Sequence, residues 1–492
     1  MLKNPKLFEI NTRVWIKRFG NNVKLSQIPD DYFKQLADKG IDIIWLMGIW
    51  KTSPPEIIEK DCFSADLISA YNKALPDWKK EDVIGSPFAI DVYEVNPQLG
   101  TFYDLEILRK RINKLGMKLF LDFVPNHFSS SSRLLKSNPE LFLKGDEESL
   151  ANDPSTFFKH GKNKAGIFAH GRDPFFPAWT DTVQLNYFNE QTREFMTQTL
   201  LDISDKCDGV RCDMAMLTLN NIFKNTWLGV LNKSDYKLPE TEYWETTVKK
   251  VKEKSSDFIF LAEAYWDLEW NLQQLGFDFT YDKKLTDRLI ANEISEVKSH
   301  LNADISYQEK SARFLENHDE QRAVVSLGTQ GSLAATVLIS TIPGMKFYFD
   351  GQFEGKKIRL PVQLGREPIE KPARMVADFY NKVFPILKNK IFIEGEFCKL
   401  ETEPTGPDNN SYDNMFAFMW KLQSEIWLVA INYSDSASQC RLIFDPETDK
   451  SKITLIDYVT GDTYVRRVEE IKNVGLYIEL KSYHYHIFSI EK

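Results

Sequence analysis

The sequence predicts an α/β protein: a (β/α)8 TIM barrel with a loop subdomain inserted after the third strand and a C-terminal antiparallel β-sandwich. Three observations support this fold class. Apolar, strand-like segments alternate with segments of helical periodicity for most of the first 390 residues. Two of the connections between them are too long for plain barrel loops. From about residue 391, short strand patterns separated by Asn, Asp and Gly turns follow one another.

Eight barrel strands are expected, at residues 8–16, 41–47, 118–124, 207–213, 258–263, 276–280, 311–316 and 345–350. Helical patterns fall between them. In residues 103–115, for example, apolar side chains recur at helical spacing, and Gly116 marks the end of that helix before the third strand. Because the strands of such a barrel are parallel, their carboxyl ends share one rim, where we expect the catalytic groups.

Two long connections leave the barrel. Residues 50–90 form a proline-containing excursion after the second strand, and residues 128–187 form another after the third. Loops of this length usually carry function or a small fold of their own. We expect the second one to wall one side of a cleft, with His170 and Trp179 as candidate wall residues. The predicted domains are the barrel (1–127 and 188–390), the inserted subdomain (128–187) and the C-terminal sandwich (391–492).

The composition argues against two classes of partner. The chain has 492 residues, a formal net charge of −9 and a pI near 5.5, without a basic stripe that could neutralise phosphates. We therefore expect no nucleic acid partner, whereas a neutral polyol suits an acidic surface. No segment reaches the roughly 18 apolar residues of a membrane-spanning helix, so no membrane contact is expected.

The cysteines and the N-terminus bear on the cellular location. The five cysteines are odd in number, widely spread and without CxxC spacing. This usage is typical of free thiols in a reducing compartment rather than of disulfides or zinc ligands. The first residues show no apolar core of a signal peptide. We therefore expect a cytoplasmic protein, and its oligomeric state stays open.

Four short segments end strand-like runs with carboxylates and recur in order along the chain. They cover residues 119–127, 209–213, 258–263 and 314–319. In a parallel barrel, strand ends that are distant in sequence converge on one rim, so these groups are expected to share a pocket. Two carboxylates at close range, steadied by a third, an Arg and two His, are the groups that a retaining glycosidase uses.

Asp213 and Glu263 suit the two carboxylate roles of that chemistry. Asp213 follows a strand, and Arg211 lies two residues earlier, on the same side by strand alternation. A guanidinium at that place keeps a carboxylate ionised and fixed, as a nucleophile requires. Glu263 ends a buried-looking strand, where desolvation raises the pKa of a carboxyl group and suits it to act as an acid.

The four segments resemble, in order and in strand context, the four signature regions of the alpha-amylase family (glycoside hydrolase family thirteen). The resemblance runs from about residue 8 to residue 355. Residues 93–101 are similar to the family's segment before the helix that precedes its first region. Residues 182–186 are similar to its short motif before the second region, and Pro343, Gly344, Tyr348 and Gly351 resemble its eighth strand.

The resemblance implies a role for each matched residue. Asp213 is expected to be the nucleophile, Glu263 the general acid/base, and Asp319 a third carboxylate that grips the sugar hydroxyls. Arg211 would orient Asp213, and His127 and His318 would hydrogen-bond the same sugar. Asp91 and Arg322 are further candidates for lining the pocket, and Phe88 is a candidate to replace the aromatic ring that commonly stacks on the sugar. Asp122 is expected to be structural.

The chain departs from the family pattern near the expected calcium site. Met216 and Leu217 stand where the family often has Lys-His, and Gln184 stands where many amylases have an Asp calcium ligand. Asn126 alone is no metal site, because hard cations need several oxygen ligands. No cofactor is therefore predicted, and calcium binding is left open.

The first hypothesis is a cytoplasmic, retaining α-glycoside hydrolase acting on α-1,4-linked glucans or maltooligosaccharides. The second is a transglycosylase or isomerase on the same scaffold, in which a sugar hydroxyl or phosphate replaces water. The third is a non-catalytic carbohydrate-binding homologue, which the presence of both Asp213 and Glu263 disfavours. The fourth is an unrelated metal-dependent barrel enzyme. Arg211 beside Asp213 disfavours it, because a positively charged guanidinium is a poor neighbour for a bound metal cation.

Overall fold

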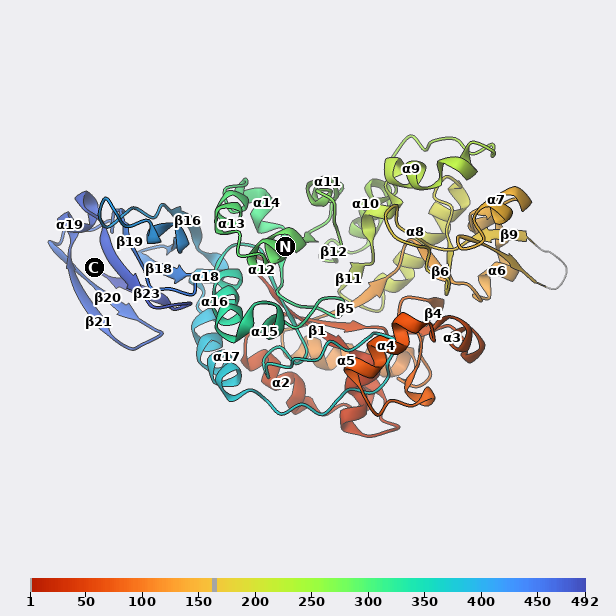
Figure 1. Cartoon of the computed structure of the whole chain (residues 1–492), viewed down its shortest axis with the longest axis horizontal. Coiled ribbons are helices and arrows are strands. Elements are labelled where there is room, and N and C mark those ends of the chain that lie inside the picture. The colour runs from red at the N-terminus through yellow and green to blue at the C-terminus, as the bar shows by residue number, and fades with distance from the viewer. Residues whose placement is uncertain (1, 162–165) are drawn as a thin grey trace.

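Eight parallel strands close a barrel at the centre of the molecule (Figure 1). The computed structural model describes residues 2–161 and 166–492. In their order around the barrel, the strands are β1 (Lys6–Asn11), β2 (Ile43–Met47), β5 (Lys118–Phe123), β11 (Gly209–Cys212), β12 (Ile259–Ala262), β13 (Phe279–Tyr281), β14 (Ser311–Arg313) and β15 (Met345–Phe349). The predicted (β/α)8 barrel is confirmed.

Helices connect these strands. The α-helices of the barrel and its loops are α1 (Thr12–Trp15), α2 (Asp30–Asp38), α5 (Phe102–Lys114), α8 (Glu190–Ser204), α9 (Asn220–Leu231), α10 (Tyr243–Lys254), α11 (Glu269–Gln274), α12 (Lys283–Ile290), α13 (Ile294–His300), α14 (Ile305–Glu309), α15 (Ala323–Ser326), α16 (Gly328–Thr341), α17 (Arg374–Leu387) and α18 (Ile391–Glu394). The helix predicted before the third strand is confirmed: Thr101 and Asp104 form a capping box at the start of α5, and Gly116 follows its end with φ +82°. No helix of the described residues is both long and apolar enough to cross a membrane.

Alternation along the strands sends one set of side chains into the barrel and the other onto the helices. Leu7 of β1 packs inside the barrel with Trp45 and Phe120, whereas Phe8 and Ile10 pack outside it. The inward set at the carboxyl ends of the strands contains polar groups. The carboxyl end of the barrel is therefore lined by polar side chains, above an apolar barrel core.

Two strand predictions need correction. The first strand was expected at 8–16, but β1 ends at Asn11 and the chain turns into α1. All four residues of α1 are buried, so no exposed polar position marks the change from strand to helix. The sixth strand was expected at 276–280, but β13 begins at Phe279, because Gly276 lies with φ +105° in the turn after α11.

Both long connections form small structures of their own. The first carries β3 (Trp50–Thr52) and β4 (Ile90–Val95), an antiparallel pair, with α3 (Pro55–Asp61) and α4 (Ala65–Ala74) between them. The second carries the pair β6 (His127–Ser129) and β10 (Thr182–Gln184), the sheet β7 (Lys144–Gly145), β9 (Gly166–Ala169) and β8 (Phe157–His160), and the helices α6 (Leu134–Ser137) and α7 (Glu147–Asn152). In Figure 1 this second structure lies at the right, beyond the barrel.

The C-terminal region is antiparallel and lies at the opposite end of the molecule (Figure 1). Its six-stranded sheet contains, in order, β16 (Glu396–Leu400), β17 (Met415–Leu422), β18 (Glu425–Asn432), β23 (Tyr485–Glu491), β20 (Lys452–Asp457) and β21 (Thr463–Arg467). The pair β19 (Ser438–Leu442) and β22 (Leu476–Leu480), with α19 (Val468–Asn473), covers one face. The other face packs on the barrel, where the Trp420 indole donates to the carbonyl of Thr341 at 2.7 Å.

Candidate active site

The carboxyl ends of β11 and β12 bring Asp213 and Glu263 to one guanidinium. These strands are adjacent and parallel, with Cys212 opposite Ala262, so the residues that follow them emerge side by side. Arg211 Nη1 lies 2.5 Å from Asp213 Oδ1, and its Nη2 lies 2.7 Å from Glu263 Oε2. The fork of a single guanidinium therefore holds the two carboxyl groups next to each other.

Aromatic rings hold Arg211 in place. Its Cζ atom lies 5.2 Å from the ring centroids of both Trp45 and Phe88 and 5.9 Å from that of Tyr281. The guanidinium is 1% exposed, and its Nε donates to the Tyr281 hydroxyl at 3.4 Å. A cation surrounded by ring faces and carboxylates is stabilised in its charged form and has little freedom to move.

Hydrogen bonds fix the Glu263 carboxyl group on both oxygens. Oε2 also accepts from the backbone N–H of Met214 at 2.7 Å, and the Tyr265 hydroxyl donates to Oε1 at 2.8 Å. Met214 has φ +42°, a left-handed conformation that costs a non-glycine residue about 1 kcal/mol or more. The strained turn after Asp213 thus aims a backbone donor at Glu263.

Burial raises the pKa of both Asp213 and Glu263. Their charged neighbours differ, however. Asp213 faces two cations, Arg211 and His318, and the carboxylate of Asp319, whereas Glu263 faces one cation, Arg211, and the two carboxylates of Asp213 and Asp319. Because nearby cations favour the ionised form and nearby anions the protonated form, a proton shared by the pair belongs on Glu263.

His318 links the third carboxylate to the barrel interior. Its Nε2 lies 2.9 Å from Asp319 Oδ2, and its Nδ1 lies 2.5 Å from Glu9 Oε1. Burial opposes a charge on this ring, but the two carboxylates outweigh it and raise the pKa of His318. Burial likewise opposes the charge of Asp319, but His318 and Arg211 outweigh it and lower the pKa of Asp319 to about 2. The sequence reasoning missed Glu9, whose only signal is an acidic residue in an apolar strand.

Phe88 and His127 lie beside these groups. The Phe88 ring lies 5.2 Å from the ring of His318, on the same side of the barrel as Arg211. His127, at the start of β6, lies 5.2 Å from the Trp179 ring, and burial lowers its pKa to about 3. His127 is therefore a neutral ring at physiological pH. His170, by contrast, is buried inside the inserted structure, where it bonds the carbonyl of Thr182.

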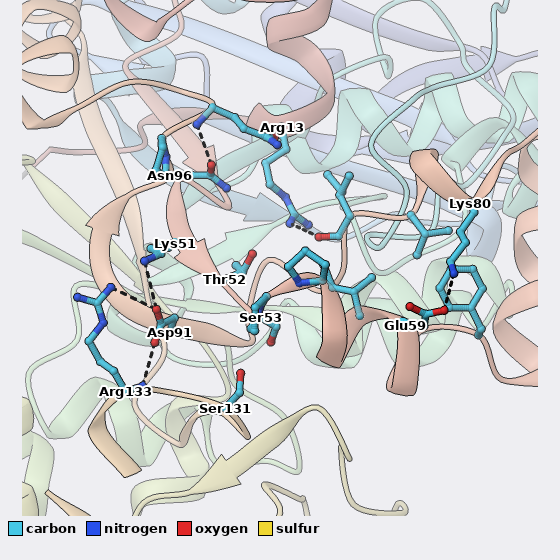
Figure 2. Close-up of a pocket in the computed structure, with 18 of the residues that line it drawn as sticks. Arg13, Lys51, Thr52, Ser53, Glu59, Lys80, Asp91, Asn96, Ser131 and Arg133 are labelled. Atoms are coloured by element: carbon cyan, nitrogen blue, oxygen red, sulfur yellow. Dashed lines mark hydrogen bonds and ion pairs between the residues drawn. The ribbon is translucent and has the colours of Figure 1, made fainter. Parts of the chain in front are cut away.

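Asp91 does not join the group. It lies on β4, in the strand pair outside the barrel, and lines a separate cavity of about 860 Å³ (Figure 2). There it bonds Arg133 at 3.3 Å and Lys51 at 3.5 Å. The expectation that Asp91 lines the same pocket as Asp213 is corrected, because β4 pairs with β3 and not with a barrel strand.

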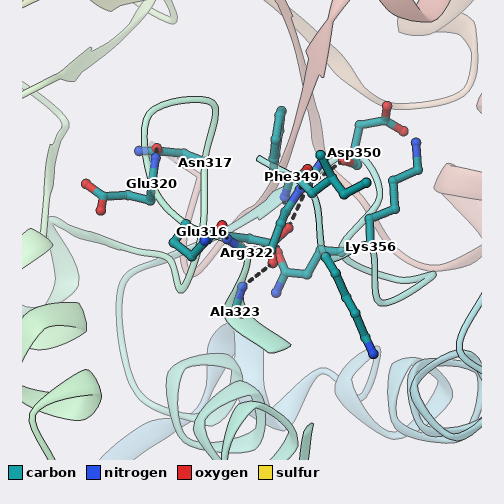
Figure 3. A network of polar contacts seen from close by, with 12 residues as sticks. Glu316, Asn317, Glu320, Arg322, Ala323, Phe349, Asp350 and Lys356 are labelled. Carbon is teal, nitrogen blue, oxygen red and sulfur yellow. Dashed lines mark hydrogen bonds and ion pairs between the residues drawn. The ribbon is translucent and has the colours of Figure 1, made fainter. Parts of the chain in front are cut away.

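Arg322 lies within a network that ties the loop after β14 to the loop after β15 (Figure 3). Its Nη1 lies 2.7 Å from Glu316 Oε1 and donates to the carbonyl of Asp350 at 2.9 Å. Its guanidinium carbon lies 4.4 Å from the Phe349 ring centroid, and the side chain is 7% exposed. The Arg322 guanidinium therefore makes these contacts with other groups of the protein.

Two cavities meet at the carboxylates. One, of about 720 Å³, contains Glu263 and Asp319 and is walled by aromatic side chains, namely Phe176, Trp179, Tyr265 and Trp266. The other, also of about 720 Å³, contains His318 and Asp319 and is walled by α4 and by residues 357–363. Asp319 borders both, so a chain-like ligand that fills both cavities passes Asp319, with Glu263 on the wall of the first cavity.

The family model described as "Alpha amylase, catalytic domain" matches residues 30–374. The chain belongs to the alpha-amylase family. It is 23% identical over 452 residues to Alpha-amylase 3 of Dictyoglomus thermophilum, covering 86% of this chain and 78% of that protein. It is 24% identical over 246 residues to a cyclomaltodextrin glucanotransferase of a Bacillus species, covering 48% of this chain and 32% of that protein.

Among solved structures, the chain is similar to a maltogenic alpha-amylase from Thermotoga neapolitana, with a TM-score of 0.70, 20% identity and 99% of each chain covered. It is also similar to the alpha-amylase from H. orenii, with a TM-score of 0.66, 18% identity and full coverage of both chains. At these identities, the likeness supports the shared fold.

Gln184 stands before β11, where many alpha-amylases have an Asp calcium ligand. The Gln184 amide donates to the carbonyl and to the side-chain oxygen of Asn126, both at 2.9 Å, and to the carbonyl of Leu185 at 3.1 Å. A donor nitrogen thus occupies the oxygens that a hard cation would need. Among the described residues, no cluster of three or more His, Cys, Asp or Glu is suited to hold a metal. At this position an amide nitrogen, and not a carboxylate, therefore faces the Asn126 oxygens.

Proposed function

We propose that this glycoside hydrolase cleaves α-1,4-linked glucans or maltooligosaccharides with retention, using Asp213 as nucleophile and Glu263 as general acid/base. The single observation that carries the proposal is the Arg211 guanidinium, which contacts both carboxyl groups, at 2.5 and 2.7 Å. A shared guanidinium keeps two carboxyl groups within a few ångströms, as the separation of about 5–5.5 Å in retaining enzymes requires.

In the first step, Glu263 donates its proton to the glycosidic oxygen while an oxygen of Asp213 attacks C1 of the sugar. The bond between C1 and the glycosidic oxygen breaks, and the leaving sugar departs with the proton as an alcohol. A β-linked glycosyl ester of Asp213 remains. The two cations that face Asp213 favour its ionised form for this attack, and burial favours the protonated form of Glu263.

In the second step, the Glu263 carboxylate takes a proton from water, and the water oxygen attacks C1. The ester bond breaks, its electron pair returns to Asp213, and the product leaves with the α configuration. The Tyr265 hydroxyl and the Met214 N–H keep the Glu263 carboxyl group oriented through both steps. Asp319, held ionised by His318, accepts hydrogen bonds from sugar hydroxyls and favours a distorted ring.

Similarity supports the substrate class. The similar proteins include alpha-amylases, a maltogenic alpha-amylase and cyclomaltodextrin glucanotransferases, whose names point to α-glucans. The aromatic walls of the cavity beside Glu263 are suited to the flat faces of sugar rings. Neutral sugars also agree with a site whose charged groups already pair with one another.

Transglycosylation is the second candidate. Phe175 and Phe176 are 68% and 65% exposed, and Phe175 packs against Trp266 at 5.0 Å between ring centroids, beside the cavity that contains Glu263. Exposed rings beside the acid offer a platform for an acceptor sugar, which then competes with water for the glycosyl ester.

We keep a cytoplasmic location as part of the proposal. All five cysteines are free thiols in the structure, four of them buried, which agrees with a reducing compartment. Fractionation of the native cells with an antibody to the protein tests this location.

One assay tests the function. The protein is incubated with maltoheptaose, pullulan, sucrose and trehalose, with and without added maltose or glucose, and the products are separated by chromatography. Shorter maltooligosaccharides from maltoheptaose support hydrolysis, and products longer than the substrate support transfer. An Asp213→Asn variant controls for contaminating amylase. Action on sucrose or trehalose alone, or on none of the four, contradicts the proposal.

A further inference from the structure

Glu9 is a carboxylate buried beneath the site. It lies on β1 and points into the barrel, as Leu7 does, and it is 0% exposed. Its Oε1 lies 2.5 Å from His318 Nδ1, and its Oε2 has no hydrogen-bond partner within the described part of the chain. The backbone carbonyl of Glu9 accepts from the N–H of Asp350 at 3.0 Å, so its main chain is fixed. A buried carboxylate with a single polar contact is costly unless that contact is a cation.

His318 meets the conditions for such a cation. Each of its ring nitrogens lies close to a carboxylate: Nδ1 is hydrogen-bonded to Glu9, and Nε2 lies 2.9 Å from Asp319 as an ion pair that lacks hydrogen-bond geometry. Burial raises the pKa of Glu9, and the contacts with His318 and Arg211 oppose that rise. Because a carboxylate accepts hydrogen bonds, a ring between two ionised carboxylates carries a proton on both nitrogens. The Phe88 ring and the edge of the Trp45 ring pack on it at 5.2 and 5.7 Å, which prevents the imidazole from turning.

We propose that Glu9 is a positioning residue that holds His318 as a doubly protonated ring and thereby keeps Asp319 charged and aimed at the sugar. This inference deepens the proposed function, and its kinetic test rests on that function. Glu9 itself does not touch the substrate, since the His318 ring lies between it and Asp319.

The surrounding charges show why Glu9 is needed. The charged or titratable groups that face Glu9, His318 and Asp319 are Arg211, Asp122, Asp213, Glu263, Tyr265, Tyr281, Glu320 and Arg359. Burial acts against the His318 charge, and only its two carboxylate contacts outweigh it. Without the charge of Glu9, His318 loses its proton more easily. Asp319 then lacks its cation while Asp213 and Glu263 repel its charge.

The first experiment needs no substrate. Histidines are labelled with ¹⁵N, and the imidazole signals of the seven histidines are followed by NMR from pH 5 to pH 9. The His318→Gln variant assigns the His318 signal. We expect His318 to stay doubly protonated across this range in the wild type. In Glu9→Gln we expect it to lose its proton within the range, with proton affinity at least tenfold lower. A neutral His318 in the wild type, or the same titration in both proteins, overturns the proposal.

The second experiment is a double-mutant cycle on hydrolysis of the α-glucan. Glu9→Gln is expected to lower kcat about 10- to 100-fold with less than a threefold change in KM, and to move the acid limb of the pH profile to higher pH. If Glu9 acts through His318, the same substitution in a His318→Gln background changes kcat less than twofold. If the effects of the two substitutions on kcat multiply in the double variant, the proposal is wrong.

A matched variant separates positioning from mere stability. Asp278→Asn removes another buried carboxylate, one that pairs with Lys252 at 2.8 Å below the barrel strands. It is expected to lower the melting temperature without moving the pH profile, whereas Glu9→Gln moves the profile. Should Glu9→Gln not fold, Glu9→Asp carries the test: an intermediate loss of proton affinity at His318 supports the proposal, and no loss overturns it. If the wild type hydrolyses no α-glucan, the proposed function fails while the NMR titration still decides the role of Glu9.

Discussion

Replacing Asp213 by Asn is the perturbation that most sharply separates catalysis from folding. The change substitutes one oxygen by an amide nitrogen and keeps the shape of the side chain. The Asp213 backbone N–H still donates to the carbonyl of Phe123 at 2.8 Å, and Arg211 keeps its contact with Glu263 at 2.7 Å. The fold therefore loses one charge-assisted contact, which corresponds to about 1–3 kcal/mol.

The effect on the rate is expected to be far larger. The amide cannot form the glycosyl ester, and the loss of its charge favours ionisation of Glu263, which then no longer acts as an acid. Removal of a residue that acts in the chemical step lowers kcat by about 10⁴-fold or more. That loss corresponds to about 5.5 kcal/mol of activation free energy. The expected increase in activation free energy thus exceeds the expected loss of folding free energy.

The assay is the initial rate of maltoheptaose cleavage, measured by chromatography, with thermal unfolding of the same samples. Asp278→Asn serves as the matched control, since it removes a buried carboxylate away from the site. An Asp213→Gly variant with added azide is expected to yield a β-glycosyl azide, because azide enters from the face that the carboxylate occupied. A kcat of Asp213→Asn near that of the wild type refutes the assigned role.

Four further predictions follow from the same geometry. Glu263→Gln is expected to lose about 10³-fold or more of its kcat on maltoheptaose, yet to release fluoride from α-maltosyl fluoride in a burst, because fluoride needs no protonation; loss of that burst contradicts the role of the acid. Activity is expected to fall as pH rises through the pKa of Glu263, which burial raises above 4.5, since the acid must be protonated; a pH–rate profile that keeps rising to pH 9 contradicts this. Treatment with EDTA is expected to leave the activity and the melting temperature unchanged, because the Gln184 amide occupies the oxygens of Asn126; loss that calcium restores contradicts it. Gly344→Ala is expected to destabilise the protein by about 3 kcal/mol or more in urea unfolding, because Gly344 has φ +103° and an added Cβ would lie 2.3 Å from the Ser311 carbonyl oxygen; wild-type stability contradicts it.

The barrel could be predicted because buried parallel strands read as continuous apolar runs. The run that ends at Ala262 is an example, and it placed β12 within one residue. The end of β1 could not be predicted in the same way. Thr12 to Trp15 are all buried although they form a helix, so the polarity pattern carries no trace of the change.

The site was predictable where it depends on strand ends alone. Arg211 lies on β11, Asp213 follows that strand and Glu263 follows the neighbouring β12, and the structure brings the three together. Asp91 was misplaced, because the sequence does not tell that its strand pairs outside the barrel. Glu9 was missed, because its partner lies 309 residues away and only the closure of the barrel joins them.

Trapping of the covalent intermediate tests the central claim most directly. The enzyme is incubated with a slow fluorinated α-maltosyl fluoride, digested and analysed by mass spectrometry. A single glycosyl group on the peptide that contains Asp213 is the expected result, and it should be absent from Asp213→Asn. A glycosyl group on any other residue, or release of the β anomer from maltoheptaose, contradicts the double displacement at Asp213.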